Sequence, residues 1–264
     1  MQHPEKINDR IYALRIPFMD IFTTVYIVKT EQGALLFDTA TYDMDVEEAI
    51  LPALHALSVG EKELKFIFLS HEHDDHAGGL DRLLKAFPKV CVVAKSEALR
   101  KRYEAYTFVS PSEGELLLDG LCAISVVGHT RDCIALLDSQ TKTLISGDCL
   151  QLYGVPGSGC WGANISFFSE YTKEIDKLRA MEIEAILAAH DFYPLGRTFF
   201  GKESVSSMLD ACLAPFQLIG QMIEEDPDAD DERICARYNA IGKYPRLGVH
   251  VVKGYRESGM SAKK

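Results

Sequence analysis

The spacing of apolar residues predicts β-strands at the start of the chain. Three short runs are rich in β-branched and aromatic residues, and turn-like breaks such as Glu31-Gln32-Gly33 separate them. The predicted strands cover residues 11–16, 23–29 and 34–37.

A helix is predicted next, because apolar residues recur at helical spacing from Val46 to Leu57. Asp45 and Glu48 have the spacing of a capping box at its start. Pro52 is expected to kink or shorten this helix, because proline lacks a backbone N–H group.

Strands and helices continue to alternate through the middle of the chain. Residues 65–69 and 90–94 are short apolar runs typical of buried strands, and a helical stripe from Leu80 to Phe87 lies between them. Ser96 is a candidate N-cap for a further helix. This alternation predicts a layered α/β protein.

The second half adds four predicted strands and one predicted helix. Ser169 is the candidate cap of the helix, which covers Tyr171 to Met181. Four glycines between Gly154 and Gly162 match no phosphate-binding motif and predict a shaped loop beside a substrate pocket. The strands cover residues 123–127, 133–137, 143–145 and 185–189.

The C-terminal part has a different character. An apolar stripe from Val205 to Leu213 predicts a helix, and Gln217 to Ile223 can extend it past Pro215. The acidic run 224–232 is expected to be a solvated loop. We therefore expect one domain over residues 1–264, with a core of about 1–198 and a helical extension of about 199–264.

Composition and charge narrow the choice of partner. The chain has 264 residues and a formal net charge of -11, which disfavours a polyanion such as nucleic acid and favours a small-molecule substrate. No signal-like N-terminus and no apolar run near the ~20 residues of a membrane span are present. We expect a cytoplasmic protein without a membrane partner. Its oligomeric state is not predicted.

The seven cysteines point to reduced thiols rather than to a redox or metal motif. They are odd in number and scattered, and they contain no CxxC pair. We expect them to be reduced and mostly in the core.

The candidate chemistry begins with an HxHxDH motif after the strand at 65–69. Its members are His71, His73, Asp75 and His76, four metal-binding side chains within six residues. If this loop is extended, His71 and His73 project to the same side, and Asp75 and His76 turn toward a neighbouring point. That arrangement suits two adjacent metals. Imidazole nitrogen and carboxylate oxygen favour zinc, with iron and manganese as alternatives.

Three later residues follow predicted strands and complete the candidate ligand set. They are His129, Asp148 and His190. Strand ends are where α/β folds gather the residues of their sites. Together with the HxHxDH motif, these three residues become candidate ligands.

The order HxHxDH, then Gly-His-Thr, then Gly-Asp, then a strand-end His resembles the metallo-β-lactamase superfamily. This resemblance implies an αβ/βα sandwich of two mixed β-sheets flanked by helices. It also implies two metal ions that share a water or hydroxide. The implied ligands are His71, His73 and His129 for one ion, Asp75, His76 and His190 for the other, and Asp148 as the bridge.

We therefore expect a dinuclear metal-dependent hydrolase that cleaves a small ester, thioester or lactone. Two close cations lower the pKa of a shared water and polarise the scissile group. Asp75 is the candidate acid/base residue. A mononuclear-iron sulfur dioxygenase and a metal-binding protein without turnover are the alternatives, and metal count and identity would separate them.

The chain differs from other members of this superfamily at several positions that affect which substrate is expected. Arg131 follows Gly-His-Thr where many members have proline, and it either reaches the substrate or forms a surface ion pair. Lactone-cleaving members commonly have tyrosine where Gln151 lies; Tyr153 and Tyr193 are the nearby candidates to replace it. One branch of zinc β-lactamases has cysteine where Asp148 lies, with Cys149 beside it, so antibiotic hydrolysis of that branch is disfavoured. The acidic C-terminal region disfavours glutathione.

The aromatic residues near the glycine-rich segment have two interpretations. Tyr153, Trp161, Phe167 and Phe168 either form apolar walls of a substrate pocket or pack against the C-terminal helices.

Overall fold

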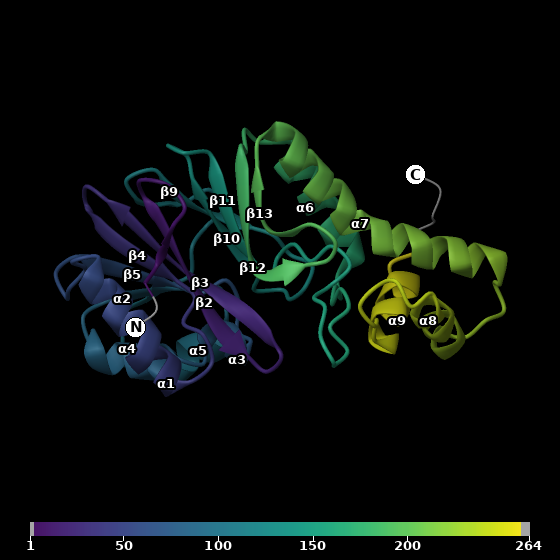
Figure 1. Cartoon of the computed structure of the whole chain (residues 1–264), viewed down its shortest axis with the longest axis horizontal. Coiled ribbons are helices and arrows are strands. Elements are labelled where there is room, and N and C mark those ends of the chain that lie inside the picture. Colours follow the sequence, from purple (N-terminus) through teal and green to yellow (C-terminus); the bar gives the residue numbers. More distant parts are fainter. Residues whose placement is uncertain (1–2, 260–264) are drawn as a thin grey trace. The chain divides into compact units, whose positions relative to one another are not determined.

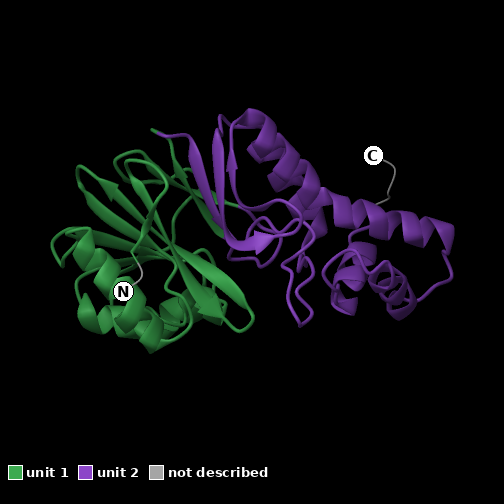
Figure 2. Cartoon of the chain, in the orientation of Figure 1, with its two compact units in different colours: residues 1–125, 134–140 green, residues 126–133, 141–264 purple. Residues whose placement is uncertain are grey.

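The computed structural model describes residues 3–259 (Figure 1). The chain folds as two compact units (Figure 2). Unit 1 contains residues 1–125 and 134–140, and unit 2 contains residues 126–133 and 141–264. The single domain expected over residues 1–264 stays a prediction.

A seven-stranded mixed sheet forms the framework of unit 1. Neighbouring strands from β1 to β4 are antiparallel, and those from β4 to β7 are parallel. The strands at 11–16, 23–29, 34–37 and 65–69 are confirmed. In sheet order the strands are β1 (Glu5–Lys6), β2 (Ile11–Phe18), β3 (Ile21–Thr30), β4 (Gly33–Phe37), β5 (Leu64–Phe68), β6 (Cys91–Val93) and β7 (Phe108–Val109).

Helices cover one face of this sheet (Figure 1). Leu36 on β4 and Ile67 on β5 pack in one core cluster with Val46, Leu54 and Leu83 from the helical segments. Burial of these side chains is the main stabilising contribution of this layer. The segments are α1 (Asp43–Asp45), η1 (Val46–Ile50), α2 (Leu51–Ala56), α3 (Asp74–Ala77), α4 (Leu80–Ala86) and α5 (Glu97–Arg102).

The first helix begins earlier than its predicted cap. Asp45 is the N-cap of η1, as its position before Val46 predicted, but its side chain makes no cap hydrogen bond there; its Oδ2 instead accepts a hydrogen bond from the backbone N–H of Tyr42 at 2.9 Å. The π-helical turn η1 precedes Pro52, which lies in the first turn of α2. Proline is tolerated there because N–H groups of a first turn have no partner within their own helix.

The second sheet is also mixed and contains six strands. In unit 1, β8 (Leu116–Leu118), β9 (Leu121–Ser125) and β10 (Ile134–Asp138) pair antiparallel. In unit 2, β11 (Thr143–Gly147) is parallel to β12 (Ala185–Phe192), which is antiparallel to β13 (Gly196–Phe200). Strand β13 was not predicted, because its Arg197 and Thr198 interrupt the apolar pattern.

Unit 2 is helical after β13, as expected, and has a further helix before β12. Its helices are α6 (Phe168–Ala180), α7 (Lys202–Glu225), α8 (Asp231–Ala240) and α9 (Val249–Glu257). Helix α7 continues through Pro215, which confirms the predicted extension. The ring of Phe168 on α6 lies 4.4 Å from that of Phe216 on α7 and 5.7 Å from that of Tyr255 on α9.

One sequence prediction in this region was wrong, and another was right over a shorter range than predicted. Ser169 lies inside α6, whose N-cap is Phe167. The acidic run 224–232 is a loop over residues 226–230, as predicted, but its two ends are helical, because Glu225 ends α7 and Asp231 begins α8. Asp230 caps α8 by accepting a hydrogen bond from the N–H of Arg233 at 2.8 Å. The acidic residues therefore serve as a helix cap and first turn, where carboxylates are favourable.

Within residues 3–259, none of the helices combines the length and apolar character that crossing a bilayer requires.

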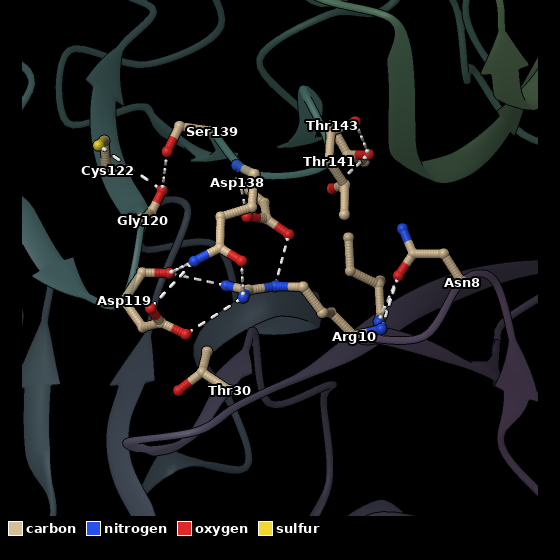
Figure 3. Close-up of polar contacts among 12 residues, drawn as sticks. Asn8, Arg10, Thr30, Asp119, Gly120, Cys122, Asp138, Ser139, Thr141 and Thr143 are labelled. Atoms are coloured by element: carbon tan, nitrogen blue, oxygen red, sulfur yellow. Dashed lines mark hydrogen bonds and ion pairs between the residues drawn. The ribbon is translucent and has the colours of Figure 1, made fainter.

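A partly buried arginine joins distant segments of unit 1 (Figure 3). The Nε of Arg10, beside the start of β2, lies 2.9 Å from Oδ2 of Asp138, at the end of β10. Its Nη2 donates to the backbone carbonyl of Asp119, and its Nη1 donates to Gln140. This network fixes the N-terminal strand against the turn between β8 and β9.

Candidate metal centre

The HxHxDH residues gather at the end of β5 and in the short helix α3. The ring centroids of His71 and His73 lie 4.6 Å apart, and those of His71 and His76 lie 4.3 Å apart. His71 and His76 are buried, whereas His73 is exposed. Unit 1 therefore brings three imidazoles together, and Asp75 lies beside them with its Oδ2 3.2 Å from Nε2 of His76.

Hydrogen bonds orient two of these imidazoles through Nδ1. Nδ1 of His76 lies 2.7 Å from Oδ2 of the buried Asp38, and Nδ1 of His71 lies 3.0 Å from Oγ of Ser70. Ser70 itself donates to Asp38 through both its N–H and its hydroxyl group. When Nδ1 of His76 donates to a carboxylate, the lone pair of Nε2 is directed elsewhere, as in histidines that ligate metals.

Asp38 was missed by the sequence analysis. Burial raises the pKa of its carboxyl group, and the contacts with His76 and Ser70 oppose that rise. Its backbone has a φ of 62°, a left-handed conformation that few residues other than glycine adopt. Its position directly after β4 was a signal that could have identified it.

Thr23 on β3 is a second partner that the sequence pattern did not reveal. Its hydroxyl group donates a hydrogen bond of 3.2 Å to Oδ2 of Asp75. This bond fixes the orientation of the carboxylate that the sequence analysis assigned to acid/base chemistry.

The glycine after the motif allows the close approach that positions it. A Cβ atom on Gly78 would lie 2.2 Å from the carbonyl oxygen of Thr41. The neighbouring Thr39 donates to the carbonyl of His76 through both its N–H and its hydroxyl group. The motif is therefore held against the loop that follows β4.

Unit 2 brings the three later candidates together around one carboxylate. Oδ1 of Asp148 lies 3.2 Å from Nε2 of His190, and Oδ2 lies 4.0 Å from Nε2 of His129. Nδ1 of His129 lies 2.5 Å from the carbonyl oxygen of Asn164. Because that carbonyl can only accept, Nδ1 carries the proton and the lone pair of His129 is on Nε2, beside Asp148.

The sequence placed Asp148 and His190 directly after strands, and this is right for Asp148 and wrong for His190. Asp148 directly follows β11, whereas His190 lies inside β12. The strand continues because its pairing with β13 resumes at Phe192 after an irregular stretch. His129 lies in the loop between β9 and β10. The ring of Tyr171 packs against Gly128, the residue before His129. A Cβ atom on Gly128 would lie 2.3 Å from that ring.

Arg131 forms a surface ion pair, which is one of the two roles that the sequence left open for it. Its Nη1 lies 3.9 Å from Oε1 of Glu170, and both side chains are exposed. Its guanidinium lies 4.1 Å from the ring centroid of Phe167.

The aromatic candidates divide between two roles. Phe168 packs against the C-terminal helices, as one of the two interpretations expected. Tyr153 belongs to a tyrosine cluster, in which its ring is stacked on Tyr244 at 4.2 Å and meets Tyr193 edge-on at 6.4 Å. Burial, followed by the neighbouring tyrosines, raises the pKa of Tyr153 to about 12.

The donor chemistry of both units fits a transition metal. The seven predicted ligands all belong to groups of His and Asp residues that could hold a metal ion. Imidazole and carboxylate donors suit zinc, iron or manganese, and the Nδ1 contacts of His76 and His129 direct Nε2 for ligation.

Comparisons with known proteins agree on one family. The sequence model of the metallo-beta-lactamase superfamily matches residues 19–190. The uncharacterized protein YobT of Bacillus subtilis is 31% identical over 173 residues, 56% of this chain and 72% of that protein. A hydroxyacylglutathione hydrolase of Prochlorococcus marinus is 21% identical, and the match spans 64% of each protein.

Solved structures extend the likeness to the C-terminal helices. A metallo-beta-lactamase family protein from Thermus thermophilus has a TM-score of 0.68 at 17% identity, over 96% of this chain and 95% of that one. The αβ/βα sandwich of two mixed sheets, with C-terminal helices, is confirmed.

Proposed function

Because the chain belongs to the metallo-β-lactamase superfamily, we propose that it is a hydrolase that uses two metal ions to cleave a small ester, thioester or lactone. In this proposal His71, His73 and His129 would hold one ion, Asp75, His76 and His190 would hold the other, and Asp148 would contribute to both. Zinc is the favoured metal, with iron and manganese as alternatives.

The observation that carries the proposal is the arrangement around Asp148. Its two carboxylate oxygens face different histidines, with Oδ1 toward His190 and Oδ2 toward His129. A carboxylate can give one oxygen to each of two ions, and the two oxygens of Asp148 are directed toward different imidazoles. The presence of one on each side supports a bridge between two ions.

The residues of the chain divide the chemical work. When bound, the two ions would supply Lewis acidity and would lower the pKa of a water molecule toward neutrality. Asp75, oriented by Thr23, accepts the proton of the attacking water and returns it to the leaving oxygen or sulfur. The new bond joins the water oxygen to the acyl carbon, and the bond from that carbon to the leaving group breaks.

Acyl substrates are favoured over polyanions. The net charge of -11 opposes long-range attraction of a nucleic acid. A thioester is one member of the proposed class, and the hydroxyacylglutathione hydrolase among the relatives carries that chemistry in its name. We propose a cytoplasmic enzyme with a small-molecule substrate.

Elemental analysis of the purified protein tests the metal centre. We expect about two transition-metal ions per chain. A content of one iron per chain would favour the sulfur dioxygenase instead. The control is His190→Ala, purified in the same way, which should contain less metal; equal metal in both proteins would contradict the ligand set.

A substrate panel tests the reaction. Aryl esters, thioesters including an acyl glutathione, lactones and a phosphodiester should be compared at low and high salt. We expect acyl hydrolysis that changes little with salt and that is lost in His190→Ala. Phosphodiester cleavage that dominates at low salt and falls steeply as salt rises would contradict the proposal.

A further inference from the structure

We propose that Gln151 is a positioning residue that couples Asp148 to His129, an inference that rests on the metal centre proposed above. Gln151 is buried in the loop that follows β11. Its Nε2 donates to Oδ2 of Asp148 at 3.3 Å. Its Oε1 accepts from the backbone N–H of Asn164 at 2.7 Å.

The second half of the connection passes through Asn164. The carbonyl oxygen of Asn164 lies 2.5 Å from Nδ1 of His129. The N–H that Gln151 binds and the carbonyl that orients His129 therefore belong to the same residue. A shift of the Gln151 side chain changes the position of the Asp148 carboxylate and the direction of the His129 ring together.

An amide is the side chain that this position requires. It supplies one donor for a carboxylate and one acceptor for an N–H, and the two face different segments. A glutamate would lose the donor and would place its own carboxylate beside that of Asp148. A methionine of similar length would lose both hydrogen bonds with little change in packing.

Helix α9 also contacts Asn164, the residue that links Gln151 to His129. Nε2 of His250 lies 2.8 Å from Oδ1 of Asn164. Asn164 is therefore held by a side chain of the C-terminal helical extension as well as by Gln151. This contact gives the extension a role in supporting the ligand loop of unit 2.

The test is Co²⁺ titration of Gln151→Met, followed by visible absorption spectroscopy and chelator competition. Co²⁺ substitutes for zinc and reports ligand geometry directly. We expect an altered absorption band and an affinity lower by roughly 10- to 100-fold, the range typical when the residues that orient ligands are changed. Circular dichroism of the metal-free protein confirms that the variant is folded.

Asn239→Leu is the matched control. Asn239 on α8 also makes two backbone hydrogen bonds, accepting from the N–H of Leu247 at 2.8 Å and donating to its carbonyl at 3.0 Å. It lies in the same unit and touches none of the proposed ligands in these bonds. We expect it to lower the melting temperature and to leave the Co²⁺ spectrum and affinity unchanged.

The outcomes separate the two proposals. If wild-type protein binds Co²⁺ and Gln151→Met gives the same spectrum and affinity, Gln151 is not a positioning residue. If wild-type protein binds none, the metal centre itself is wrong, and this proposal is wrong with it. Should Gln151→Met fail to fold, Gln151→Glu takes its place. That variant keeps the acceptor for Asn164, so an unchanged spectrum overturns the proposal and a changed one supports it.

Discussion

The Oδ1 atom of Asp148 lies 3.2 Å from Nε2 of His190, and its other oxygen faces His129. If Asp148 bridges two ions, Asp148→Asn should weaken both, because it removes negative charge from the shared position. We expect both affinities to fall by more than the roughly 10- to 100-fold that is typical of changes outside the ligand set. Calorimetric metal titration measures this.

The control for Asp148→Asn is Asp210→Asn in α7, whose exposed carboxylate pairs with Arg179. That variant should bind both ions normally. Two independent and undisturbed sites in Asp148→Asn would show that the carboxylate is not a bridge.

His73→Ala should remove at least one ion per chain and nearly all activity. The ring of His73 lies beside that of His71, and a site with few ligands does not retain its metal after losing an imidazole. Metal analysis and activity assays check this. His55→Ala, at an exposed position in α2, is the control and should match the wild type. Full metal content in His73→Ala would remove His73 from the ligand set.

Asp75→Asn should lower kcat more than it changes KM. A carboxylate that transfers a proton acts mainly in the transition state, and general acid/base residues contribute roughly 100-fold or more to rate. Steady-state kinetics measure the two constants, with metal content checked because asparagine ligates weakly. Asp74→Asn, at the exposed neighbouring position, is the control. A raised KM with unchanged kcat would assign Asp75 to binding.

Arg10→Met should destabilise unit 1, because it removes the cation that faces the buried carboxylate of Asp138 at 2.9 Å (Figure 3). Removing one partner of a buried ion pair costs about 3–5 kcal/mol. Urea denaturation measures the loss. Arg100→Met breaks the exposed pair with Glu97 and should change stability by less than about 1 kcal/mol. Equal effects of the two variants would show that the Arg10 network adds little.

Thiol alkylation should separate Cys160 from Cys212. Cys160 is exposed, whereas burial raises the pKa of the Cys212 thiol to about 11. Because the thiolate is the reactive form, Cys212 should remain unlabelled in the folded protein at pH 8, and its labelling should rise only as the pH approaches that value. Mass spectrometry after timed iodoacetamide treatment follows both sites. Equal labelling rates in the native protein would contradict the buried position of Cys212.

Local patterns were sufficient for most of the first sheet and for the choice of candidate ligands. Runs of β-branched and aromatic residues predicted the strands at 11–16 and 23–29. The HxHxDH motif identified His71, His73, Asp75 and His76, because these side chains are close in sequence. Unit 1 confirms that the three imidazoles lie together.

The residues that orient those ligands could only be found in the tertiary structure. Asp38 lies 38 residues from the histidine that it contacts, and Asn164 lies 35 residues from His129. Hydrogen bonds over such separations leave no periodic pattern in a sequence. The amino-acid sequence thus determined which donor types are present, because that depends on residue identity alone. Folding decided which nitrogen of each imidazole is directed for ligation and that Phe168 packs against helices, because both depend on contacts between distant segments.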